Sequence, residues 1–139
     1  MIFARSAVWT SLLVAVVVVA ASGCGTAGVP KPITSMQSIA GTWVGPASLP
    51  GGVNVPSARV TIAPDGTYSA IAGAFSAQGK AEIKDGALTM VPTSSTGGLA
   101  MVAGNRSSSA SLTDRGGSMV LTGYGHSDKG PFYFELTKQ

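Results

Sequence analysis

The stretch "AQGKAEIK", Ala77–Lys84, decides the fold class, because its side chains alternate in character at every step. A period of two is typical of a β-strand that exposes one face and buries the other. The polar face carries Gln78, Lys80, Glu82 and Lys84, and the face expected to be buried carries Ala77, Gly79, Ala81 and Ile83. Asp85-Gly86 comes next, a pair that supplies the positive φ angles of a tight hairpin turn. We therefore expect an antiparallel strand here, followed directly by its partner.

The same alternation recurs on both sides of this strand. Near the end of the chain, "FYFEL" places Phe132, Phe134 and Leu136 on the inner face, with Tyr133 and Glu135 outside. Shorter apolar pairs repeat the pattern at Val60 and Ile62, Leu88 and Met90, Ala110 and Leu112, and Met119 and Leu121. In "TYSAIAG", residues 67–73, the phase stays open because Tyr68 and Ile71 fall on opposite faces.

Turn signals separate these segments at hairpin spacing. They are "PDG" at residues 64–66, "KDG" at 84–86, "DRGG" at 114–117 and "SDKG" at 127–130. Eight or nine short strands joined in this way form an antiparallel meander, and a meander of about eight strands removes its exposed edges by closing on itself. The sequence therefore predicts an all-β fold, a small up-and-down antiparallel barrel over residues 38–139.

A leader segment precedes the strands. Arg5 is its one charged residue, and ten consecutive apolar residues run from Leu12 to Ala21. A membrane-spanning helix needs about 20 such residues, whereas a basic start, a short apolar helix and a small-residue exit describe an export signal. The exit, "ASG", stands directly before Cys24, the single cysteine of the chain. Cys24 could also follow an ordinary signal peptide, or be buried as a small hydrophobic residue.

Residues 1–24 resemble the signal peptide and lipobox of bacterial lipoproteins. The resemblance implies that residues 1–23 are removed and that Cys24 becomes the acylated N-terminus, which makes the membrane a partner; two or more acyl chains give a stable anchor. It also implies an extracytoplasmic place in a bacterial cell envelope. Ala21 departs from the leucine that is commonest at its position. Gly25 is not the aspartate that retains some lipoproteins in the inner membrane, which favours the periplasmic side of an outer membrane in a Gram-negative cell.

The next residues, 24–37, are predicted to form a flexible tether. They include "GTAGVPKPITSM", which has two prolines, many small residues and no periodicity. A dozen extended residues reach about 40 Å, so such a tether would hold the domain clear of the lipid headgroups.

The stretch "SMQSIAGTWVG", Ser35–Gly45, supports a barrel. It resembles the start of the first strand in lipocalins and the wider calycin group, where a helical turn leads into Gly-x-Trp. Here the two residues are Gly41 and Trp43, and the resemblance implies that Trp43 plugs the closed end of the barrel. Lipocalins usually cover this tryptophan with an arginine from the last strand, whereas this last strand offers only Lys138.

Composition and spacing argue against several classes of function. Without Arg5 the chain has eight basic and six acidic side chains, and the basic ones are scattered, which excludes a nucleic-acid footprint. His126, Ser127 and Asp128 are sequence neighbours, whereas catalytic triads are assembled from separate parts of a fold. One histidine and dispersed carboxylates provide no metal-ligand cluster. We therefore expect a non-enzymatic protein that needs no metal or cofactor.

Two functions remain open, and the barrel interior separates them. Small inward residues favour a void for a small apolar ligand or lipid, for which the candidate lining is Ala77, Gly79, Ala81, Phe132 and Phe134. An eight-stranded barrel can instead be filled by its own side chains. The alternative is then a protein-interaction or envelope-structural module, such as an inhibitor, that uses the exposed loops at residues 46–57 and 95–106.

Overall fold

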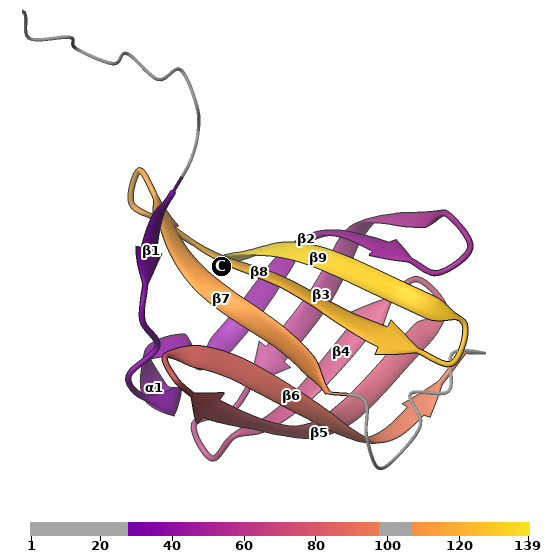
Figure 1. Cartoon of the computed structure of the whole chain (residues 1–139), viewed down its shortest axis with the longest axis horizontal. Helices are drawn as coiled ribbons and strands as arrows, with labels where there is room; N and C mark the ends of the chain where they lie inside the picture. Colours follow the sequence, from indigo (N-terminus) through magenta and orange to yellow (C-terminus); the bar gives the residue numbers. More distant parts are fainter. Residues whose placement is uncertain (1–27, 98–106) are drawn as a thin grey trace, which may run out of the picture.

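The structure, a computed structural model, describes residues 28–97 and 107–139. Its main body is an antiparallel β-barrel, accompanied by one further strand and one short helix (Figure 1). In chain order the elements are β1 (Val29–Lys31), α1 (Met36–Ile39), β2 (Gly41–Leu49), β3 (Val53–Ile62), β4 (Thr67–Ala72), β5 (Phe75–Lys84), β6 (Ala87–Thr96), β7 (Ser108–Arg115), β8 (Ser118–Ser127) and β9 (Gly130–Lys138).

The barrel closes through eight strands. Each strand from β2 to β9 pairs antiparallel with the next, and β9 also pairs with β2. The β6–β7 ladder is short, joining Leu88–Met90 to Ser108–Ala110. Farther along β7, β1 takes the place of β6 and pairs with Leu112–Asp114. The predicted all-β fold with a closed antiparallel barrel is confirmed, with β1 as an addition.

The four predicted turns all join neighbouring strands. Asp85 and Gly86 have φ angles of 52° and 75°, so both central residues of the β5–β6 turn lie in the left-handed region, which matches the right-handed twist of the strands. In the β3–β4 turn, the Asp65 carboxylate accepts hydrogen bonds from the backbone N–H and the hydroxyl of Thr67 at 2.9 and 2.7 Å. The turn signals in the sequence therefore fix the hairpin register locally.

Trp43 lies at one end of the barrel beside α1, and this end is called the closed end below. The Trp43 side chain is 0% exposed, and its indole N–H donates a hydrogen bond of 2.9 Å to the carbonyl of Ile39. Lys138 lies opposite Trp43 on β9, and its ammonium stands 5.7 Å from the ring centroid while donating to the Ser38 carbonyl at 3.2 Å. The predicted burial of Trp43 is confirmed, and Lys138 supplies the cation that covers it.

The predicted tether is wrong for residues 29–37. β1 pairs with β7, the backbone N–H of Ile33 donates to the Gly86 carbonyl at 2.8 Å, and Ile33 is 2% exposed within the main core cluster. The prolines misled the prediction: Pro30 lies in a short strand paired on one side, where a missing N–H costs little. The predicted signal peptide and Cys24 lie outside the described residues.

The predicted loop over residues 46–57 is also wrong, because most of it is strand. β2 continues to Leu49 and β3 begins at Val53, so only residues 50–52 form the turn. Pro46 on β2 faces two residues of β3, Pro56 and Ser57, where the register shifts. A proline has no N–H to give to a ladder, so both prolines fit this β-bulge. Of the other predicted loop, residues 98–106 lie outside the described residues.

No helix in residues 28–97 and 107–139 is long and apolar enough to cross a bilayer.

Candidate functional site

The barrel interior holds a cavity of only about 60 Å³. It lies toward the end remote from Trp43, and apolar side chains form nearly all of its wall. Of the predicted ligand residues, Ala77, Phe132 and Phe134 line the cavity, whereas Gly79 and Ala81 do not. Small-molecule sites usually have volumes of about 300–1,000 Å³, so the described side chains leave far less room than such a ligand needs.

Aromatic rings occupy the space that the small residues of β8 leave open. Gly123 pairs with Phe134, and Gly125 pairs with Phe132, across the β8–β9 ladder. A Cβ added at either glycine would collide with the ring of its partner. These glycines therefore accommodate the phenylalanine rings, and the small residues of β8 do not enclose a void.

Gly79 is small for a different reason, which is the close approach of the β6 backbone, and Ala81, two residues on, is held by a backbone hydrogen bond. A Cβ at Gly79 would meet the carbonyl of Val91 and the Cα of Pro92 on β6, beside a register shift in the β5–β6 ladder. The N–H of Ala81 donates to the Gly66 carbonyl at 2.6 Å, and Ala81 is buried. Both positions therefore serve strand packing.

Tyr68 is a polar residue in the wall of the cavity. It is 7% exposed, and burial raises the pKa of its hydroxyl from 10.0 to about 12. The sequence left its phase open, and the β4–β5 register settles it: Tyr68 lies opposite Gly79, while Ile71 is 54% exposed. Tyr68 therefore places a hydroxyl in the largely apolar interior, where Ser108 is another buried hydroxyl residue in the cavity wall.

The burial of Tyr68 predicts a loss of stability at high pH. Between pH 10 and about 12 the unfolded chain releases the Tyr68 proton and the folded chain keeps it, so the folded state becomes relatively less stable as the pH rises. We expect a loss of up to about 2–3 kcal/mol across this window, measured by urea unfolding, and a clearly smaller loss in Tyr68→Phe. Equal losses in both proteins would contradict the assignment.

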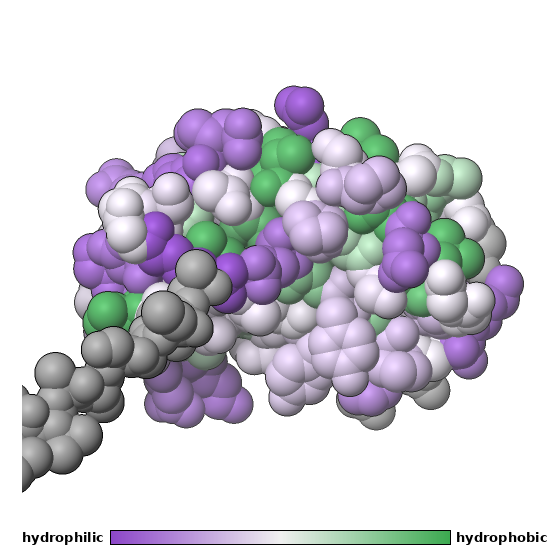
Figure 2. Space-filling model, turned by 90° about the horizontal axis from the view of Figure 1, so that it is seen from above, coloured by the Kyte–Doolittle hydropathy of each residue, from purple (hydrophilic) through white to green (hydrophobic). Residues whose placement is uncertain are grey.

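A larger groove lies on the outside of the barrel, with a volume of about 390 Å³. It is lined from β2, β3, β8 and β9 around the β-bulge at Pro46 and Pro56. Most of its exposed surface is apolar, from residues that include Ala47, Val55 and Phe134, and its polar lining residues are Ser48, Asn54, Thr122, Tyr133 and Glu135. Figure 2 looks onto the molecule from above and shows hydrophilic, weakly polar and apolar residues intermixed across the face in view. The bulge bends the two strands and so hollows this side of the barrel.

The groove belongs to a wider surface, the hydroxyl wall, defined as the outward-facing residues of β2, β7, β8 and β9. Direct pairing places Ser48 beside Tyr133, Tyr133 beside Tyr124, and Tyr124 beside Ser109. Tyr133 and Tyr124 are 58% and 55% exposed. By strand alternation the wall carries eight hydroxyl residues besides the tyrosines: Thr42, Ser48, Ser109, Ser111, Thr113, Ser118, Thr122 and Thr137.

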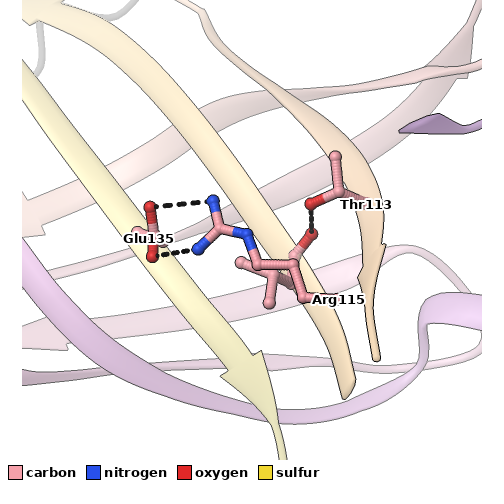
Figure 3. Close-up of polar contacts among 4 residues, drawn as sticks. Thr113, Arg115 and Glu135 are labelled. Atoms are coloured by element: carbon pink, nitrogen blue, oxygen red, sulfur yellow. Dashed lines mark hydrogen bonds and ion pairs between the residues drawn. The ribbon is translucent and has the colours of Figure 1, made fainter. Parts of the chain in front are cut away.

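Two opposite charges on the hydroxyl wall are paired with each other. Arg115 on β7 donates two hydrogen bonds to the Glu135 carboxylate on β9, at 2.6 and 3.3 Å (Figure 3). The register puts β8 between them, and Val120, which lies there, is 4% exposed although it is on the outward phase. The hydrogen bond to Glu135 raises the pKa of the Arg115 guanidinium. The pair thus neutralises this part of the wall and covers Val120.

The structure gives no support for a triad at His126. His126 is exposed and Ser127 is buried on the opposite face of β8, where its hydroxyl donates to the Gly130 carbonyl at 3.0 Å. Within residues 28–97 and 107–139, no three His, Cys, Asp or Glu side chains lie close enough together to hold a metal ion.

Sequence reasoning missed the tyrosine pair, although a signal for it was present. The "SDKG" turn pairs Ser127 with Gly130, and counting back along both strands from there brings Tyr124 opposite Tyr133. Comparison with protein-family models, with curated proteins and with solved structures finds no match.

Proposed function

We propose that this protein is a lipid-anchored, non-enzymatic interaction module of a bacterial cell envelope, and that it contacts its partner through the outside of a filled barrel. The observation that carries the proposal is the interior, whose cavity of about 60 Å³ is too small for a typical ligand. The outside offers a groove several times larger, at about 390 Å³. Of the two functions left open by the sequence, the interaction module is therefore the better supported.

The second candidate is a binding module for a small apolar ligand. It is favoured by one observation, the apolar cavity with Tyr68 in its wall. A ligand of ordinary size could enter only if Phe132 and Phe134 moved, and their rings are seated against the glycines of β8. Such a displacement would sacrifice packed aromatic contacts, so we place this function second.

The position of β1 determines which end of the barrel a lipid anchor at Cys24 would hold near the membrane. Val29 pairs with Asp114 and Gly28 lies against Arg115, so β1 begins beside the β7–β8 turn, at the same end of the barrel as α1 (Figure 1). The five steps from Cys24 to Val29 span at most about 18 Å. An acylated Cys24 would therefore hold the closed end of the barrel near the membrane and direct the other end away from it.

Mass spectrometry tests both the lipid anchor and the absence of a ligand from the barrel interior. We express the whole sequence and extract the protein from membranes. We expect it to lack residues 1–23 and to carry the covalent mass of a diacylglyceryl group, and we expect native mass spectrometry to show no non-covalent ligand. Cys24→Ser should lose the covalent mass and leave the detergent phase, because a protein without its acyl chains has no stable anchor.

Two outcomes would contradict the proposal separately. A Cys24→Ser protein that is processed, so that residues 1–23 are gone, and that still partitions with the membrane would refute the lipid anchor. A stoichiometric lipid that stays bound in the Cys24→Ser protein would show that the barrel takes a ligand, and would favour the second candidate.

A further inference from the structure

We infer that the hydroxyl wall binds a neutral glycan chain, with Tyr124 and Tyr133 as its stacking platform. The inference rests on the proposed function, in which the outside of the barrel makes the contacts. It is carried by three properties of the same surface: paired exposed aromatic rings, a dense set of uncharged hydrogen-bonding groups, and charges that are already paired.

The tyrosines provide the apolar part of the site. They are direct cross-strand neighbours on the outward face of β8 and β9, and more than half of each side chain is exposed. Side chains opposite one another in a ladder lie about 5 Å apart. Two adjacent rings thus offer an apolar platform with polar tips. One face of a sugar ring is made of C–H groups, and this face can stack on such a platform.

Uncharged polar groups surround the platform. Asn54 and Ser48 continue the row on β3 and β2, and Ser109 continues it on β7. Hydroxyl and amide side chains can both donate and accept hydrogen bonds, which suits a ligand that presents hydroxyl groups around every ring. With strands about 4.8 Å apart, the five-strand row spans about 19 Å, which is long enough for several linked sugars.

Charge decides between classes of partner. In the four described strands of the wall, Arg115 and Glu135 are the outward Lys, Arg, Asp or Glu residues, and they neutralise each other. On β3, which extends the row, Arg59 is exposed, and it lies opposite Val44, away from the tyrosine row. An anionic polymer would need cations free to pair with its charged groups, whereas an uncharged glycan needs none.

The groove supplies the shape. It runs beside Tyr133 along the bent part of β2 and β3, and its volume of about 390 Å³ lies in the range of small-molecule sites. A polymer can lie along it and continue past it, because the groove is a surface depression bounded by strands and not a closed cavity. The proposed ligand is therefore an extended chain that uses the groove and the platform together.

The test uses the full-length protein in a detergent without a sugar headgroup and measures retention on insoluble chitin, insoluble cellulose and heparin beads. We expect retention on at least one of the two neutral polymers, changing less than about twofold between about 50 and 500 mM salt. The double variant Tyr124→Ala/Tyr133→Ala should bind at least about tenfold more weakly. The matched Tyr→Phe pair keeps both rings and should stay within about threefold of wild type.

Ile71→Ala is the control, because Ile71 is similarly exposed but lies on β4, outside the wall. It should bind like wild type. Three outcomes would each overturn the inference. They are no retention on either neutral polymer, retention that is unchanged in the Tyr124→Ala/Tyr133→Ala variant, and retention only on heparin that is lost as the salt concentration rises. These outcomes leave the proposed function standing, whereas a lipid found inside the barrel would remove its basis in the filled interior.

Discussion

Replacing Trp43 with alanine should lower the free energy of unfolding by about 3–5 kcal/mol. The indole is fully buried at the closed end, and its N–H donates to the Ile39 carbonyl at 2.9 Å. Alanine would leave a cavity between α1 and the barrel and an unpaired carbonyl beside it. For a single domain of this size, the loss is a large part of the total stability.

Urea unfolding followed by circular dichroism measures this loss, since the variant also lacks the buried tryptophan that would report by fluorescence. Lys138→Met is the matched control, because it removes the ammonium above the ring and keeps an apolar stem. We expect it to cost no more than about 1 kcal/mol, the value of an exposed cation–π contact. A Trp43→Ala protein within about 1 kcal/mol of wild type would show that the closed end does not depend on this side chain.

Strand alternation and turn chemistry explain why the barrel could be predicted. In Ala77–Lys84 the buried and exposed residues follow the predicted phase, apart from a partly exposed Ile83. The "KDG" and "DRGG" signals fall at the β5–β6 and β7–β8 turns. Both features are local, because a side chain's face depends on its place in the strand and a turn depends on two or three residues.

The features that could not be predicted depend on which strands pair with one another. Tyr68 and Ile71 are both apolar enough to be buried, and the choice between them depends on Gly79, which lies on the next strand. Gly123 on β8 shows the same dependence, since it would leave a void only if no ring stood opposite, and the ring of Phe134 stands there. The sequence of one strand gives the side chains on one side of a contact, whereas packing depends on the side chains of both paired strands.

The candidate site was likewise predictable where it depends on one strand and not predictable where it depends on strand pairing. The outward phase of Tyr133 was predicted from "FYFEL", but its value as a platform depends on Tyr124, and the groove depends on a bulge between two other strands. Pro46 and Pro56 lie in the segment that was predicted to be an exposed loop. In the structure they face each other within a ladder, so one irregularity accommodates both.

Replacing Ile33 with alanine should lower the free energy of unfolding by about 2–5 kcal/mol. A tether residue would give almost no effect, so the experiment separates the two descriptions of residues 28–37. Ile33 is 2% exposed in the main core cluster, and its N–H donates to the Gly86 carbonyl at the β5–β6 turn. Its side chain therefore fixes the segment between β1 and α1 to the closed end.

Val29→Ala is the matched control, because Val29 lies four residues earlier on β1 and is 68% exposed. It should change stability by less than about 0.5 kcal/mol. Amide hydrogen exchange adds a second readout: in Ile33→Ala the amides of β1 should lose protection before those of β8, because three paired residues cannot hold a strand without a buried neighbour. If Ile33→Ala and Val29→Ala unfold at the same urea concentration, residues 28–35 are not part of the folded core. The argument that an acylated Cys24 holds the closed end near the membrane would then lose its structural basis.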